Sequence, residues 1–122
     1  MPGVLLIDDD RGVREACAEA LRSAGLEVHE ATDGVEAFRR LSLVKERPRF
    51  VVLDLHMPRM DGFEFLEQLK MYPSAGDVRV LLVSGDPNVR GAEHSPGVVG
   101  VISKPIQLGD LVARITGSGS HA

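Results

Sequence analysis

The sequence predicts an α/β fold built on a doubly wound parallel sheet, and two patterns support this prediction. Short apolar runs alternate with amphipathic stretches about five times along the 122 residues. Such an alternation favours a parallel sheet with helices on both faces, joined by right-handed crossovers. Several apolar runs also end in polar or charged residues. Sheets of this kind bind ligands at the carboxyl ends of their strands, so these residues are the first candidates for function.

Five segments are predicted to be strands. Residues 26–30 alternate apolar and polar side chains, as a half-exposed edge strand would. Residues 50–53 are apolar throughout, which is typical of a central strand covered on both faces. The other three predicted strands are residues 4–7, 78–83 and 98–102.

The two stretches that flank the edge strand have helical spacing. Asp10 is a candidate N-cap of the first helix, and Gly25 marks its end. The second helix is expected to start at Asp33, with Glu36 in a capping-box arrangement, and to end before Pro48. The residues that follow helical spacing in the first stretch are Val13, Ala16, Cys17, Ala20, Leu21 and Ala24. The second helix is expected to bury Ala37, Leu41 and Val44.

Two further helices are expected in the second half of the chain. One begins after Asp61-Gly62 and the other forms the end of the domain. Between them, the crossover over residues 87–96 contains Gly91 and two prolines, so any helix there is brief. The first of these helices is predicted to carry Phe63, Leu66 and Leu69 inward. The amphipathic pattern of the last is given by Leu108, Leu111, Val112 and Ile115.

Composition narrows the classes of function. The apolar share of 43% and the charged share of 26% are near the average for a soluble globular domain. A net charge of −4 gives no electrostatic support for direct binding of nucleic acid. No apolar run approaches transmembrane length, and no leader precedes the first strand. The single cysteine, Cys17, excludes an internal disulfide and favours a reducing compartment such as the cytoplasm.

The length fits one domain. We expect residues 1–116 to form it. Residues 117–122 are rich in glycine and serine and are interpreted as a flexible linker or a cloning remnant.

Polar residues at the ends of four predicted strands form a candidate site. Asp8 and Asp9 follow the first strand, Asp54 the third, Ser84 the fourth and Lys104 the fifth. In a parallel sheet these positions share one edge, where three carboxylates repel each other unless a cation lies among them. Mg²⁺ takes one or two carboxylates together with waters and phosphate oxygens. The residues therefore predict a Mg²⁺ site beside a phosphoryl-binding position.

Each of these residues has a chemical role in that site. Asp54 is the candidate nucleophile, because a carboxylate can accept a phosphoryl group as an aspartyl phosphate. Lys104 can bind a phosphoryl oxygen as a point charge, and Ser84 can donate a hydrogen bond to the same group. A cis bond between Lys104 and Pro105 would direct the lysine inward. Taken singly, the three have ordinary alternatives: a loop cap, a surface charge and a turn residue.

Together these residues resemble the receiver domain of two-component response regulators. The resemblance covers residues 3–116 and implies a flavodoxin-like (βα)5 fold with strand order 2-1-3-4-5. The matching motifs are Ile7-Asp8-Asp9, Leu53-Asp54-Leu55-His56-Met57-Pro58 with Asp61-Gly62, Val83-Ser84-Gly85 and Ser103-Lys104-Pro105.

The resemblance implies a role for each site residue. Asp54 would be the phospho-acceptor, Ser84 the switch hydroxyl and Lys104 the phosphate-binding lysine. The implied ligands of Mg²⁺ are Asp9, Asp54, the backbone carbonyl of His56 and, through a water, Asp8.

The resemblance also implies partners. The phosphoryl donor would be a histidine kinase or a histidine phosphotransfer protein. The signal would pass to a downstream effector protein or to an output domain outside this chain, and the only chemistry would be self-phosphotransfer and autodephosphorylation. Neither direct nucleic-acid binding nor a membrane is implied, while dimerisation through the last two strands and the last helix stays open.

Three positions depart from the family pattern or vary within it. Val101 occupies the place of the usual tyrosine or phenylalanine, which puts the usual aromatic switch in question. His56 and Asp86 flank the acceptor, at positions that tend to set how fast water attacks the phosphoryl group. We expect His56→Ala to change autodephosphorylation more than metal affinity.

Three other classes of function fit these residues less well. A phosphorylation-independent interaction module on the same fold is the alternative, which Val101 favours slightly and the complete acidic pocket disfavours. A phosphatase of the haloacid dehalogenase type would carry a second acid where this chain has His56. A flavin-binding domain is disfavoured because its phosphate cradle needs backbone amides and small residues, whereas the first loop here is acidic.

Overall fold

The computed structural model of the protein describes residues 3–43, 48–55, 62–71, 78–86, 89 and 91–117. Its strands are β1 (Gly3–Ile7), β2 (Glu27–Ala31), β3 (Phe50–Asp54), β4 (Arg79–Ser84) and β5 (Val98–Ser103). They form one parallel sheet in the order β2-β1-β3-β4-β5. The predicted fold class and strand order are therefore confirmed, and the strand ends differ from the expected ones by at most one residue.

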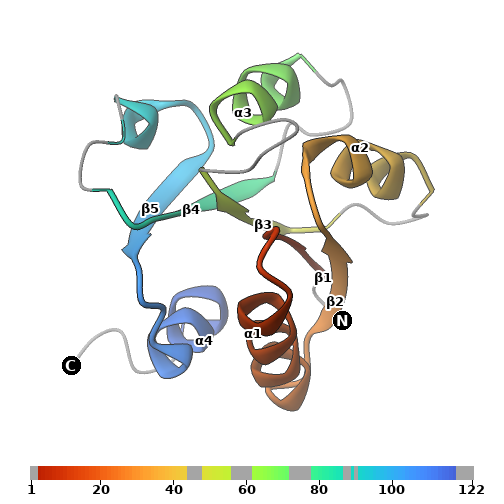
Figure 1. The fold of residues 1–122 in the computed structure, drawn as a ribbon, viewed down its shortest axis with the longest axis vertical. Coiled ribbons are helices and arrows are strands. Elements are labelled where there is room, and N and C mark those ends of the chain that lie inside the picture. The colour runs from red at the N-terminus through yellow and green to blue at the C-terminus, as the bar shows by residue number, and fades with distance from the viewer. Residues whose placement is uncertain are drawn as a thin grey trace.

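Helices cover both faces of the sheet, as predicted. Within the described ranges they are α1 (Arg11–Ser23), α2 (Gly34–Leu43), α3 (Gly62–Lys70), the 3₁₀-helix η2 (Ala92–His94) and α4 (Leu108–Thr116). Helices α1 and α4 lie on one face, and α2 and α3 lie on the other (Figure 1). Each layer encloses its own hydrophobic cluster. Because all five strands are parallel, their carboxyl ends lie at the same edge of the sheet.

Burial of the strands follows their place in the sheet. Every residue of β3 is buried, as expected for the central strand. In β2, at one edge, only Val28 and Ala31 are buried. The sequence pattern therefore predicted correctly which strand is central and which lies at an edge.

Helix α1 has the predicted caps but a slightly different buried face. Asp10 accepts a hydrogen bond from the Val13 amide at 3.1 Å. Gly25 follows the helix with φ +91°, a conformation that glycine adopts readily. The buried side chains are Cys17, Ala18 and Leu21. The helix turns its 17–18–21 face to the sheet, so Ala16, Ala20 and Ala24 of the apolar pattern stay partly or fully exposed.

Helix α2 begins with a variant of the predicted capping box. The Asp33 side chain accepts from the Glu36 amide at 2.8 Å. The Glu36 carboxylate reaches back to the amide of Thr32, at 3.1 Å, one residue before the cap. Both predicted core residues of the described part, Ala37 and Leu41, are buried, whereas Val44 lies outside the described residues.

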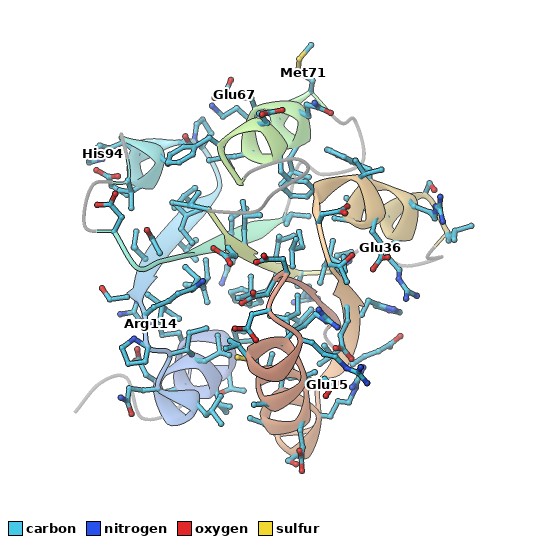
Figure 2. All side chains as sticks on the ribbon, in the orientation of Figure 1. Glu15, Glu36, Glu67, Met71, His94 and Arg114 are labelled. Atoms are coloured by element: carbon cyan, nitrogen blue, oxygen red, sulfur yellow. The ribbon has the colours of Figure 1, made fainter. Side chains whose placement is uncertain are left out.

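Helix α3 packs closely against the end of β3. Leu66 and Leu69 are buried as predicted, but Phe65 is fully buried and Phe63 only partly. The Phe65 ring stacks on Phe38 of α2 with a centroid distance of 4.7 Å, which explains why it takes the inner position. On the outer side of the helix, Glu67 points away from the sheet (Figure 2).

The fourth crossover and the last helix agree with the prediction in outline. The described part of residues 87–96 contains only the three-residue η2, and α4 buries Leu111 and Ile115. Val112 is half-buried, whereas Leu108 is exposed. The Leu108 side chain borders an apolar cavity of about 560 Å³ between α1 and α4. No helix in the described part of the chain is long and apolar enough to cross a membrane.

Candidate functional site

The structure brings three carboxylates together at the carboxyl edge of the sheet. Asp8 follows β1 and Asp54 ends β3, and these two strands are neighbours. The ligand oxygens of Asp8, Asp9 and Asp54 all lie within 4.8 Å of one another. Asp8 and Asp54 are 3% and 1% exposed, whereas Asp9 is exposed. The cluster therefore has a buried floor and one carboxylate open to solvent.

The loop after β1 holds Asp8 in a fixed position. Its amide donates to the carbonyl of Ala31 at 3.1 Å, which extends the pairing of β1 with β2. Its Oδ1 accepts from the Asp10 amide at 2.9 Å. Asp10 in turn caps α1, so it serves the helix as predicted.

Lys104 reaches this cluster from the end of β5. Its Nζ lies 3.0 Å from Asp54 Oδ2, and about a third of its side chain is exposed (34%). The Lys104-Pro105 bond is cis, as the sequence suggested. Partial burial lowers the pKa of Lys104, but the hydrogen bond to Asp54 and the charges of Asp54, Asp8 and Asp9 raise this pKa more, and the net shift is upward. The lysine is therefore a cation at this site.

Ser84 lies at the same edge but directs its hydroxyl to its own loop. The side chain is buried, and Oγ donates to the carbonyl of Asp86 at 2.8 Å while accepting from the Asp86 amide at 3.0 Å. The Ser84 carbonyl accepts from the Lys104 amide at 3.0 Å. Ser84 thus connects the ends of β4 and β5. A contact between its hydroxyl and a phosphoryl group would require rotation of the side chain.

The electrostatics of the cluster favour a cation. Burial, and after it the charge of Asp54, raise the pKa of Asp8, whereas the Asp10 amide and the Lys104 charge lower it; the net result is a pKa of about 6. An ionised Asp8 is consequently costly without more positive charge nearby. Three carboxylates within reach of each other, one of them open to solvent, fit a small hard cation such as Mg²⁺.

The structure also places the residues at which this chain departs from the family pattern. Val101 is half-buried and packs against the hydrophobic cluster on the α2–α3 side. Asp86 is exposed beside the site. His56 lies outside the described residues, so the role expected of its carbonyl stays a prediction.

Sequence reasoning missed two residues that shape the site. Arg14 of α1 donates from Nη1 to the carbonyl of Asp8 at 3.0 Å. Gly62, recognised only as part of a motif, lies so close to β3 that an added Cβ would be 2.5 Å from Leu55 Cα and 2.6 Å from the Asp54 carbonyl oxygen. The arginine is an ordinary polar residue on a helix, and only the fold shows that it faces the loop after β1.

Comparison with known proteins agrees with the fold. The family model described as the response regulator receiver domain matches residues 4–116. The response regulator MprA of Mycobacterium leprae is 39% identical over 115 residues, which make up 92% of this chain and 48% of that protein. The chain thus spans about half the length of the curated relatives it matches.

Solved structures give the same result. Chemotaxis protein CheY4 of Vibrio cholerae superposes with a TM-score of 0.86 at 28% identity, covering 96% of this chain and 98% of that one. A response regulator receiver protein from Pseudomonas putida superposes with a TM-score of 0.85 at 28% identity, covering 96% and 97%. With the matching family model and the convergent acidic cluster, these likenesses show that the chain belongs to the response regulator receiver domain family of two-component signalling.

Proposed function

We propose that this domain accepts a phosphoryl group on Asp54, in a Mg²⁺-dependent reaction, and thereby changes its affinity for a partner. The observation that carries the proposal is the surrounding of Asp54. Its carboxylate is buried, lies within 4.8 Å of two other carboxylates and is hydrogen-bonded to the ammonium of Lys104. Such a carboxylate suits a nucleophile that must approach an anionic phosphoryl group and then carry the negative charge of that group. The acidic neighbours can bind a cation, and the ammonium supplies positive charge directly.

The donor in this proposal is a phosphohistidine on a histidine kinase or a phosphotransfer protein. A carboxylate oxygen of Asp54 attacks phosphorus as the bond from phosphorus to the imidazole nitrogen breaks. The bonding electrons leave with the imidazole, which then takes up a proton. Lys104 orients the Asp54 carboxylate at 3.0 Å and can transfer its hydrogen bond to a phosphoryl oxygen.

Metal binding is assigned to the acidic cluster. Asp9 and Asp54 would bind Mg²⁺ directly, Asp8 through a water and His56 through its carbonyl. When bound, Mg²⁺ supplies the positive charge that lets two anionic groups approach. The chain's own contribution is to hold the carboxylates in place, which the hydrogen bond from the Asp10 amide to Asp8 Oδ1 does before any ligand arrives.

The switch would start at Ser84. Its hydroxyl is held by both backbone groups of Asp86, and a phosphoryl group on Asp54 would offer a charged acceptor instead. Turning this hydroxyl frees the loop after β4. Because Val101 stands in place of an aromatic side chain, the movement would propagate through loop rearrangement rather than through an inward-turning ring.

We assign this function to residues 1–116 and leave the tail out of it. Since the matched relatives are about twice as long as this chain, we propose that the response passes to a separate effector protein or to a further domain. Self-association through the face that contains β5 and α4 is the other route, and it would be tested by the oligomeric state after phosphorylation.

The test is phosphorylation by a small donor. The protein and its Asp54→Asn variant are incubated with Mg²⁺ and acetyl phosphate and weighed intact by mass spectrometry. One phosphoryl group on the native chain only, abolished by a chelator, is the expected result. An adduct that survives in Asp54→Asn would show that the acceptor is another residue.

A phosphorylation-independent interaction module is the second candidate, favoured by Val101 and by the Ser84 hydroxyl, which is hydrogen-bonded to the backbone of Asp86 in its own loop. Failure of the native chain to bind beryllofluoride with Mg²⁺, together with failure to accept phosphate from a kinase, would decide for this candidate.

A further inference from the structure

We propose that Arg14 is a positioning residue for the metal site, acting through the peptide group that joins Asp8 to Asp9. This inference rests on the proposed function, because it concerns the site at which Mg²⁺ would bind. Within the described part of the chain, the contacts of Arg14 near the site are to the backbone from which two of the three carboxylates extend. Arg14 would therefore orient the residues that bind the metal, without binding the metal itself.

The contacts of Arg14 connect the site to two elements. From α1, its Nη1 donates to the Asp8 carbonyl at 3.0 Å, and its Nε lies 3.2 Å from Glu30 Oε1 on β2. The side chain is only 12% exposed, so water competes weakly for these contacts. A planar guanidinium held by a carboxylate at one nitrogen has little freedom to turn. The ion pair with Glu30 therefore fixes the direction in which Nη1 points.

The Asp8 carbonyl and the Asp9 amide belong to one rigid peptide plane. Holding the carbonyl oxygen in place therefore also fixes the orientation of the Asp9 amide and the position of the Asp9 Cα. The Asp8 amide is held separately, by the Ala31 carbonyl at 3.1 Å. The Asp8 amide is thus held by the Ala31 carbonyl and the Asp8 carbonyl by the Arg14 side chain. The two neighbouring carboxylates therefore start from defined positions, although Asp9 itself is exposed.

A second arginine in the same network provides a matched control. Arg22 also lies on α1 and binds the other oxygen of Glu30, with Nη1 at 3.2 Å from Oε2. Its Nη2 donates to the carbonyl of Val28 at 2.9 Å, on β2 and away from the loop after β1. Loss of Arg22 removes an α1–β2 connection of the same kind but does not touch the Asp8–Asp9 peptide.

The experiment compares metal affinity in three variants of the full chain: Arg14→Met, Arg14→Lys and Arg22→Met. Binding of Mn²⁺ is followed by the loss of the free-ion electron paramagnetic resonance signal, and binding of Mg²⁺ by calorimetry. We expect Arg14→Met to weaken binding about tenfold, as loss of groups that orient metal ligands does. Arg22→Met should stay within about twofold of the native chain. Arg14→Lys should lie between them, since one ammonium can replace only part of the planar fork.

The metal-free protein gives an independent readout. In a ¹⁵N-labelled sample without metal, Arg14→Met should shift the amide resonances of Asp9 and Asp10, whereas Arg22→Met should leave them in place. If Arg14→Met fails to fold, Arg14→Lys carries the decision, with a loss of about threefold or more expected, short of the tenfold full loss.

Equal affinities in the native chain and Arg14→Met would overturn the inference, and so would an equal loss in Arg22→Met, which would make the network a general connection of α1 to β2. Failure of the native chain to bind either ion is a different result. It would remove the proposed metal site itself, and the inference with it.

Discussion

At the scale of single residues, negative charge at the acidic cluster exceeds the positive charge of Lys104 beside it in the described, metal-free protein. Among the residues that the structure describes, three carboxylates gather beside the ammonium of Lys104. The pKa of Asp8 is raised to about 6, chiefly by burial and to a smaller extent by the charge of Asp54. Function therefore conflicts with stability at this residue, as is common for groups that await a ligand.

Substituting Asp8 by asparagine should stabilise the metal-free protein. A carboxyl whose pKa is raised from 3.8 to about 6 in the folded state is protonated more readily there than in the unfolded chain, so its ionisation costs stability as pH rises through this window. Asp8→Asn should add about 1–3 kcal/mol at pH 7.5 and about half as much at pH 5. Urea unfolding at the two pH values measures this difference. A variant less stable than the native chain at pH 7.5 would contradict the prediction.

Removing Lys104 should have the opposite effect on stability. Lys104→Met leaves the buried Asp54 without its ammonium at 3.0 Å, so we expect a loss of about 1–3 kcal/mol in the metal-free protein. Mg²⁺ should bind a few-fold more tightly, because the ion no longer competes with a cation for Asp54. Calorimetry and urea unfolding measure the two effects. Arg11→Met, which loses only an exposed ion pair with Glu15, is the control and should change neither.

At the scale of elements, the site depends on how closely α3 approaches β3. The amide of Gly62, the first residue of α3, donates to the Leu55 carbonyl at 2.9 Å, just past Asp54. No side chain fits between the two elements at this point. The glycine is thus required by packing against the residue that carries the function.

Gly62→Ala should therefore destabilise the domain by about 2–4 kcal/mol, since the new Cβ would meet Leu55 Cα at 2.5 Å, well inside any tolerated contact. Gly109→Ala is the matched control, because Gly109 also lies in the first turn of a helix and an added Cβ there meets nothing within 4 Å. It should stabilise the domain by about 0.5–1 kcal/mol through helix propensity. Thermal unfolding compares the two, and equal effects would contradict the role given to the close approach.

At the scale of the whole molecule, the alternation of apolar runs and helical stretches was enough to predict the layers, the central strand and the edge of the sheet that holds Asp8, Asp54, Ser84 and Lys104. These features depend on period and order, which a sequence displays directly. The inner position of Phe65 and the reach of Arg14 depend on side-chain contacts between elements distant in sequence, with Phe38 and Glu30. Such contacts are absent from any local pattern, so only the fold could show them.

The site is also coupled to the stability of the whole domain, because a metal bound only by the folded state shifts unfolding by mass action. At a Mg²⁺ concentration of about 100 times Kd the folded state should gain about 2.7 kcal/mol at pH 7.5. The gain should shrink below about pH 6, where the folded protein takes up a proton on Asp8 and loses one of the charges that attract the ion. Thermal unfolding with and without Mg²⁺ between pH 5 and pH 8 measures this dependence. In Asp8→Asn the gain should be small at every pH, and a gain in the native chain that did not depend on pH would show that Asp8 is not part of the metal site.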